Sequence, residues 1–349
     1  MRKLVFVAPG KLGFRLIFIL VLCFVLSPTI NCQTSTQTES VLKKKHEEFS
    51  NWKYGMFLHF NMATYIDREW ATGYEDPMLF NPVDLSCDQW TDVIHSAGMK
   101  YAVLTVKHTG GWCLWDSKYT THDITAFRNY KNGKGDIVRE FVNACRKKNI
   151  KVGLYYCLPG DYSHSYGNSL DPGQKDLHGM PPEAEGDFKG FIEKQVTELL
   201  TNYGKVDLMW FDQFSNKYTG KNWQQLKALV HKLQPECIVV ANNAENYGDS
   251  DIIGYEYPWR VQVNPDTAVP PDGNKNVAEL CDCIDADGIW FWHTGKIRLQ
   301  EAENIVDRLK FCNERSTNLL LDVPPDRSGL IDTVYIKRLE KIYQISFQK

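Results

Sequence analysis

Residues 205–214 are Lys205-Val-Asp-Leu-Met-Trp-Phe-Asp212-Gln-Phe, and this stretch decides how the fold is interpreted. It begins as an apolar run typical of a buried strand and ends on a carboxylate directly after Trp210 and Phe211. A charge beside two aromatic rings costs free energy unless another group pairs with it or a reaction uses it. At the carboxyl end of a parallel strand, such a carboxylate is a natural nucleophile. Asp212 is therefore the first candidate for a functional residue.

Seven other short apolar runs accompany this stretch, and longer amphipathic segments separate many of them. The eight runs, each expected to be a strand, are Gly55–Phe60, Tyr101–Val106, Val152–Tyr156, Val206–Phe211, Ile238–Ala241, Ile252–Tyr255, Ile289–Trp292 and Leu319–Val323. Apolar residues three and four positions apart predict helices over Asp88–Ala97, Asp136–Lys148, Phe188–Tyr203, Trp223–Leu233, Leu299–Asn313 and Asp332–Gln344.

Strands that alternate with helices form right-handed βαβ units and a parallel sheet. Eight such units predict an α/β protein with a (β/α)8 TIM-like barrel. An open doubly wound sheet is the alternative, but no Gly-x-Gly-x-x-Gly follows any early strand, so a dinucleotide site has no support. No helical pattern fits between Ala241 and Ile252, which predicts a barrel distorted by missing helices.

Composition is that of a soluble globular protein, with 43% hydrophobic and 24% charged residues in a chain of 349. The net charge of −3 gives no electrostatic reason to expect nucleic acid or an anionic membrane surface as partner. Aromatic residues make up 13% of the chain, which fits either an aromatic-rich core or a cleft that stacks sugar rings.

The N-terminus has the pattern of an export signal. Basic residues precede the apolar run 16–26, and Ser27-Pro28 follows it, so we expect a signal peptide over residues 1–32. A polar linker over 33–45 and a single barrel domain over 46–349 complete the expected organisation. Export implies a periplasmic, secreted or lysosome-like location, without stable membrane association unless a lipid is attached at Cys32.

Eight of the ten cysteines follow this segment, and several lie in apolar runs where a Cys behaves as a small buried hydrophobe. Some of them could pair in an exported protein. Cys281-Asp-Cys283 lacks the spacing and the second pair of a zinc site, so the sequence predicts neither a metal nor another cofactor.

Functional residues of a barrel cluster just past the carboxyl end of each strand. At six of the expected strands these positions carry imidazoles, carboxylates, a lysine and aromatic rings, namely His59-Phe60, Lys107-His108, Tyr155-Tyr156, Asp212, Glu256 and Phe291-Trp292-His293. Two carboxylates with imidazoles and aromatic rings favour glycosidic-bond chemistry. No Gly-x-Ser-x-Gly elbow or phosphate-binding loop is present, so seryl and phosphoryl chemistry have no support.

The chain resembles the retaining α-L-fucosidases of glycoside hydrolase family 29 from about Trp52 to Leu330. The motifs that carry this resemblance are Tyr54-Gly-Met-Phe-Leu-His59-Phe, Glu69-Trp70, Tyr101-Ala-Val-Leu-Thr-Val-Lys107-His108-Thr-Gly-Gly-Trp112-Cys-Leu-Trp115, Gly153-Leu-Tyr155-Tyr156, Trp210-Phe-Asp212 and Asn318-Leu-Leu-Leu-Asp-Val-Pro-Pro-Asp326-Arg-Ser-Gly-Leu330. The resemblance implies exo-acting release of α-L-fucose from glycans by double displacement, with a fucosylated oligosaccharide or glycoconjugate as substrate.

The resemblance also implies residue roles. Asp212 would be the nucleophile, and Glu256 is the candidate acid/base, with Glu245 and Glu279 as alternatives. Glu279 resembles a position that the family uses structurally before the seventh strand. The implied fucose-binding residues are His59, Trp70, His108, Tyr155 and Phe291, with Phe291 lining the face that receives the C5 methyl group; Trp70 and Phe291 could instead be core aromatics.

Two departures from the family pattern affect the predicted pocket. Many members have a second histidine where this chain has Thr109, and an arginine where it has Ala244. The family's C-terminal β-sandwich is also expected to be missing, because one helix follows the last strand. A hydrolase of a related L-sugar such as an α-L-galactoside, and a catalytically impaired fucose-binding protein, are therefore the alternative functions.

Overall fold

The computed structural model describes residues 29–158, 181–212, 218–257, 268–295 and 297–348. The chain divides into two units, Met1–Ser40 and Val41–Lys349, and helix α1 (Thr29–Ser50) begins in the first and ends in the second. Residues 33–45, expected as a linker, are helical here, and most of the expected signal, residues 1–28, lies outside the described part. Among the described helices we find none that combines the length and the hydropathy of a membrane span.

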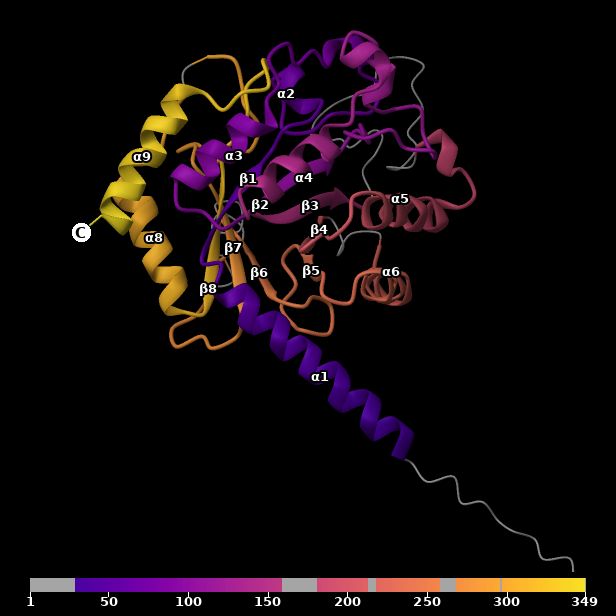
Figure 1. Ribbon diagram of the computed structural model, residues 1–349, viewed down its shortest axis with the longest axis vertical. Helices are drawn as coiled ribbons and strands as arrows, with labels where there is room; N and C mark the ends of the chain where they lie inside the picture. Colours follow the sequence, from indigo (N-terminus) through magenta and orange to yellow (C-terminus); the bar gives the residue numbers. More distant parts are fainter. Residues whose placement is uncertain (1–28, 159–180, 213–217, 258–267, 296, 349) are drawn as a thin grey trace, which may run out of the picture. The chain divides into compact units, whose positions relative to one another are not determined.

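Eight parallel strands form one sheet in the order β5-β4-β3-β2-β1-β8-β7-β6 (Figure 1). They are β1 Tyr54–Leu58, β2 Tyr101–Lys107, β3 Lys151–Cys157, β4 Leu208–Asp212, β5 Ile238–Ala241, β6 Ile253–Glu256, β7 Ala278–Cys283 and β8 Thr317–Asp322. Within the described residues no ladder joins β5 to β6, but the Asp251 amide donates to Val239 and the Gly254 amide to Ala244 across the gap. The sheet is thus a nearly closed barrel, and the predicted (β/α)8 TIM-like fold is confirmed.

The helices lie around the outside of the strands (Figure 1). The longer ones are α3 Cys87–Ser96, α4 Ile137–Lys147, α5 Phe188–Asn202, α6 Gly220–Leu233, α8 Ala302–Glu314 and α9 Thr333–Phe347, and the shorter ones are α2 Ala63–Ile66, η1 Pro77–Leu79, η2 Ile124–Ala126, η3 Lys131–Gly133 and η4 Pro182–Ala184. Four of the longer helices begin at side chains that accept a bond from the first turn, Ser86, Asp136, Asp187 and Asp332. Between β5 and β6 the described chain has no helix, as the sequence predicts.

Alternation along the strands divides the core into two layers. In β4, Met209 and Phe211 pack between the strands and the helices, whereas Leu208 and Trp210 pack inside the barrel. Asp212 lies two residues after Trp210 and therefore faces inward at the carboxyl rim.

The seventh strand is not where the apolar pattern predicts it. Residues 289–292 form a loop, and β7 is Ala278-Glu-Leu-Cys-Asp-Cys283, whose charges hid it from a search for apolar runs. Those charges are compensated inside the fold. Glu279 accepts bonds from the Tyr101 hydroxyl at 2.7 Å and the Trp210 indole at 2.8 Å, and Asp282 pairs with Arg308 at 2.8 Å.

The end of α1 closes the amino end of the barrel. Phe49 is fully buried against Trp52 and Tyr101, and its carbonyl accepts a bond from Asn318 at the start of β8. Lys45, also buried, donates to Asp251 at 3.0 Å beside the gap between β5 and β6. The helix end therefore reinforces the barrel where its backbone ladder is interrupted.

All eight cysteines after Cys32 are buried thiols. Burial raises the pKa of the Cys145 thiol well above its usual range, and the same holds for Cys237 and Cys281. The prediction that these residues act as small buried hydrophobes is confirmed.

Candidate active site

Asp212 ends β4 and reaches the carboxyl rim of the barrel, half-buried. Its Oδ2 accepts a hydrogen bond from the Tyr155 hydroxyl at 2.8 Å, and its Oδ1 accepts one from the Asn242 amide at 2.9 Å. Two donors on one carboxylate fix its orientation. The arrangement therefore supplies an oriented carboxylate at the rim of the barrel.

Glu256 ends β6 and shares a donor with Asp212. The Asn242 Nδ2 that bonds Asp212 also bonds Glu256 Oε2 at 2.9 Å, and Asn243 donates to the same oxygen at 2.8 Å. Because one nitrogen bonds both carboxyl oxygens at 2.9 Å, these oxygens stand no further apart than twice that distance. The two carboxylates that were paired on sequence grounds are thus brought together.

The two alternative glutamates occupy different environments. Glu245 is exposed in the turn that follows β5. Glu279 lies within β7 inside the barrel, where both carboxyl oxygens already accept bonds from Tyr101 and Trp210. Burial raises the pKa of Glu279 to about 7. Glu256 is the glutamate that bonds the same amide as Asp212.

His59 follows β1 and is buried next to the end of β8. Its Nδ1 lies 2.7 Å from Asp322 Oδ1. Burial lowers the pKa of His59 to about 4, against the opposing effect of the Glu69, Asp212 and Glu256 carboxylates, and burial raises the pKa of Asp322 well above its usual range. The short contact between Nδ1 and Oδ1 fixes the orientation of the His59 ring.

A β-bulge brings His108 into the site. The register of β2 against β3 shifts between Thr105 and Lys107, so Lys107 turns outward to bond Tyr156 at 3.0 Å. His108 then stacks on the Tyr155 ring with centroids 5.4 Å apart. A bulge near a site commonly redirects a side chain in this way. Thr109, at the departure from the family pattern, lies with its hydroxyl 3.2 Å from His108 Nδ1.

Phe291 lies in the loop after β7 and contacts both imidazoles. Its ring centroid is 5.2 Å from that of His59 and 4.8 Å from that of His108, both edge-on. Glu69 holds this loop by accepting bonds from the Trp290 amide at 2.9 Å and from the His293 ring at 2.9 Å. The hydrogen bond and the charge of Glu69 raise the pKa of His293. The predicted apolar wall is therefore buried and anchored.

Trp70 follows Glu69 directly and is half-buried. Its neighbour in the chain bonds the Phe291 loop, which places the Glu69-Trp70 motif at the same edge of the site. The predicted residues His59, His108, Tyr155, Asp212, Glu256 and Phe291 are joined by hydrogen bonds or ring contacts, directly or through Asn242.

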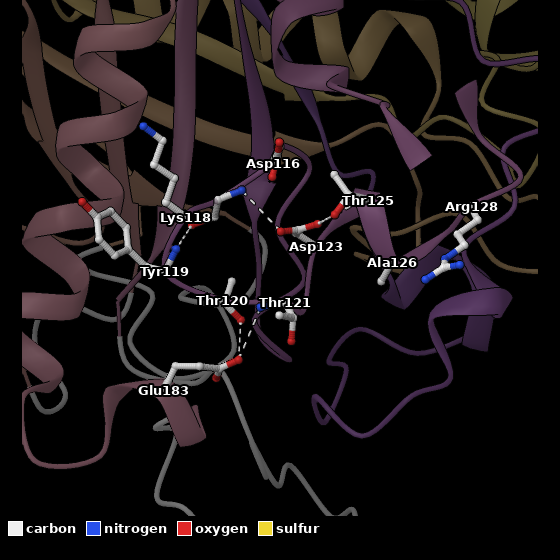
Figure 2. Close-up of a pocket in the computed structure, with 11 residues that line it drawn as sticks. Asp116, Lys118, Tyr119, Thr120, Thr121, Asp123, Thr125, Ala126, Arg128 and Glu183 are labelled. Atoms are coloured by element: carbon white, nitrogen blue, oxygen red, sulfur yellow. Dashed lines mark hydrogen bonds between the residues drawn. The ribbon is translucent and has the colours of Figure 1, made fainter. Parts of the chain in front are cut away.

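A cavity of about 740 Å³ lies elsewhere, in the long connection between β2 and α4 (Figure 2). None of the predicted site residues lines it. Two of its carboxylates bond this connection: Asp123 accepts bonds from Thr125 at 2.8 Å and 2.6 Å, and Glu183 of η4 accepts bonds from Thr120 and Thr121. These contacts explain how the connection is held, and the candidate chemistry lies with the residues of the barrel rim.

Several residues that shape the site were not predicted from the sequence, namely Asn242, Asn243, Trp290 and Asp322. Asn242 follows the expected strand Ile238–Ala241, so the strand-end rule that found Asp212 also points to it. Asp322 lies inside the motif Asn318-Leu-Leu-Leu-Asp, where a charge after three leucines was the available signal.

Comparison with known proteins identifies the family of the chain. The family model described as alpha-L-fucosidase matches residues 25–344. Alpha-L-fucosidase 1 of Arabidopsis thaliana is 30% identical over 317 residues, which cover 84% of this chain and 58% of the relative. The chain thus spans somewhat more than half the length of that relative.

Solved structures share the fold. Alpha-L-fucosidase isoenzyme 1 from Paenibacillus thiaminolyticus superposes with a TM-score of 0.67 at 26% identity, covering 87% of this chain and 76% of the other. A glycoside hydrolase 29 family member from an unknown rumen bacterium superposes with a TM-score of 0.63 at 27% identity, covering 85% and 55%. The chain belongs to the α-L-fucosidase family, glycoside hydrolase family 29.

Proposed function

We propose that this protein is an exo-acting, retaining α-L-fucosidase in which Asp212 is the nucleophile and Glu256 the acid/base. One observation carries the proposal: a single Asn242 nitrogen lies 2.9 Å from a carboxyl oxygen of each residue. Retaining glycosidases place their two carboxyl groups about 5–5.5 Å apart, whereas inverting enzymes separate them by about 6.5–9.5 Å to admit a water. The shared donor supports the shorter spacing.

The reaction would proceed in two displacements. Asp212 attacks the anomeric carbon of the fucoside while Glu256 donates its proton to the departing oxygen, so the glycosidic bond breaks as the ester bond to Asp212 forms. Glu256, now a carboxylate, takes a proton from water, and the oxygen of that water attacks the anomeric carbon. The ester breaks, and fucose leaves with its original anomeric configuration.

The remaining site residues would bind the sugar. His59 and His108 offer ring nitrogens to hydroxyl groups, and Tyr155 orients Asp212 by its 2.8 Å bond. Phe291, in contact with both imidazoles, offers an aromatic edge to the C5 methyl group, and Trp70 would bound the ring from the Glu69 side.

A related L-sugar is the second candidate, because Thr109 and Ala244 replace two polar family residues. The Phe291 ring, anchored through Glu69, favours fucose over an α-L-galactoside, whose C5 substituent adds a hydroxyl that an apolar wall leaves unpaired. A comparison of kcat/KM for aryl α-L-fucoside and aryl α-L-galactoside decides between them, and a higher value for the galactoside would reject fucose as the substrate.

The substrate class and the location belong to the same proposal. Fucosylated oligosaccharides or glycoconjugates would bind with only the terminal fucose at the rim. The basic and apolar pattern of residues 1–32 supports export to a periplasmic, secreted or lysosome-like compartment. Cell fractionation of the full-length chain tests this, and recovery in the cytosol with residues 1–32 intact would contradict it.

Hydrolysis of a chromogenic α-L-fucoside tests the activity and the assignments. We expect turnover by the wild type, a loss of about 10³-fold or more in Asp212→Ala, and rescue of Glu256→Ala by azide, which needs no general base. Glu245→Ala is the matched control and should behave as the wild type, because that side chain is exposed in the turn after β5. Full activity in Asp212→Ala, or azide rescue of Glu245→Ala instead, would reject these catalytic roles.

A further inference from the structure

We propose that Asn242 is a positioning residue that fixes the spacing of Asp212 and Glu256 and donates an N–H to whichever of the two carries the negative charge. The inference rests on the proposed function and adds a residue that the family resemblance did not supply.

The position of Asn242 follows from the barrel topology. Strand β5 lies next to β4 in the sheet, and the backbone N–H of Asn242 extends their ladder by donating to the Phe211 carbonyl at 2.8 Å. Alternation from Ile238 and Val240, both in the inner layer, turns the Asn242 side chain inward. Its nitrogen then lies between Asp212 on β4 and Glu256 on β6, where no backbone ladder joins the described residues of β5 and β6.

The chemistry of the amide suits this position. Its NH2 group carries two hydrogens, one for each carboxyl oxygen, and both partners accept, so the nitrogen must face them. The other amide atom, Oδ1, is buried and has no hydrogen-bond partner among the described residues. A buried, unsatisfied acceptor costs free energy. A residue of purely structural value would have little reason to carry that cost, whereas a shared N–H donor gives one.

The Asn242 side-chain amide also suits the transfer of negative charge from Asp212 to Glu256 during the reaction. In the first displacement the negative charge leaves Asp212, as its oxygen bonds carbon, and appears on Glu256, as its proton goes to the leaving oxygen. Asn242 donates to both oxygens at 2.9 Å, so it faces the charge before and after this step. A lysine or arginine at this place would hold Glu256 ionised and unable to donate. A neutral amide with two hydrogens avoids that.

Other titratable groups also face the pair and must be held constant in any test. They are Tyr155 on β3, His59 after β1 and Cys281 on β7, which each interact with both carboxylates, and behind them Cys157, Glu69 and Glu279, which interact with those three residues. All of them remain in an Asn242 variant, so a difference from the wild type reports the amide. Asn243 provides the matched comparison, because its amide donates to Glu256 at 2.8 Å from the next position in the chain.

The pH profile of kcat/KM distinguishes the effect of the Asn242 side chain from that of the Asn243 side chain. The acidic limb requires ionised Asp212 and the basic limb requires protonated Glu256. Because each N–H stabilises a carboxylate, Asn242→Ala should move both limbs to higher pH by about one unit and lower kcat/KM by about a hundredfold. Asn243→Gly, chosen because Asn243 has φ 60°, should move mainly the basic limb. Unmoved limbs in Asn242→Ala would overturn the inference.

A second variant and a second measurement keep the test decisive. If Asn242→Ala fails to fold, Asn242→Ser replaces it, and since one hydroxyl can donate to only one carboxylate, at least one limb must still move. Carboxyl carbon NMR titration of labelled Asp and Glu measures both groups without turnover. Raised titration midpoints of Asp212 and Glu256 in the Asn242 variant support the inference, and unchanged midpoints overturn it. A wild type that is inactive on fucosides would reject only the proposed function.

Discussion

At the scale of single residues, the carboxylates of this protein are distinguished by what donates to them. Asp212 and Glu256 share one amide at the open rim, whereas Glu279 lies below them and accepts from Tyr101 and Trp210. Burial raises the pKa of Glu279 to about 7, and this shift affects the stability of the fold. All three residues are carboxylic acids, and their different environments give them different roles.

The raised pKa of Glu279 predicts a pH dependence of stability. Below about pH 4.5 both folded and unfolded states are protonated; between 4.5 and about 7 the unfolded state loses its proton while the folded state keeps it. The free energy of unfolding should therefore fall over this window by about 3 kcal/mol and level off above it. In Glu279→Gln this contribution should vanish, and Glu245→Gln should keep the wild-type slope. Urea unfolding across pH measures it, and equal slopes for the wild type and Glu279→Gln would refute the prediction.

Several residues were predictable and several were not, for identifiable reasons. His59, His108, Tyr155 and Asp212 lie at or just past the ends of apolar runs, so the strand-end rule locates them from the sequence alone. Asp322 and the Glu69 contacts could not be predicted in this way, because a bond to His59 or to the Trp290 amide joins segments more than two hundred positions apart.

At the scale of elements, apolar runs predict a strand only where its inward side chains are apolar. Apolar runs predicted seven of the eight strands, but β7 carries Glu279 and Asp282 and was replaced by the nearby run Ile289–Trp292. A strand inside a barrel can hold charges when the opposite wall supplies donors, and sequence patterns do not show that wall. The bulge in β2 is a second such case, since only the register against β3 reveals that Lys107 turns outward and His108 inward.

The end of helix α1 illustrates how an element outside the barrel secures it. Lys45, His231 and Lys227 surround Asp251, and although burial opposes its charge, their hydrogen bonds and charges hold the pKa of Asp251 well below its usual range. This ion cluster lies beside the gap between β5 and β6, the two strands that lead to Asn242 and Glu256.

Two adjacent lysines test this function of α1. Lys45→Ala leaves a buried carboxylate without its closest lysine and should lower the free energy of unfolding by about 3 kcal/mol. Lys44→Ala removes an exposed pair with Glu236 and should cause no measurable change. Both should keep the wild-type kcat, because this end of α1 packs at the amino end of the barrel. Equal stability of the two variants in urea would contradict the stabilising role of the cluster.

At the scale of the whole molecule, the barrel explains why residues from six strands meet. Parallel strands place their carboxyl ends on one rim, so His59, His108, Tyr155, Asp212, Asn242 and Glu256 converge although they are spread over about two hundred positions. The fold class was predictable from the alternation of strands and helices alone. The chain matches only part of the length of its curated relatives, so the activity proposed for it rests on this rim.

Trapping the glycosyl-enzyme tests the role of Asp212 at the level of the covalent bond itself. An activated 2-fluoro-fucoside, whose fluorine slows hydrolysis of the ester, is incubated with the wild type, and the protein is digested and analysed by mass spectrometry. A double displacement at Asp212 predicts one sugar adduct on the peptide that contains Asp212, and no adduct in Asp212→Ala. An adduct on another residue, or rapid turnover with an inverted product and no adduct, would contradict this mechanism.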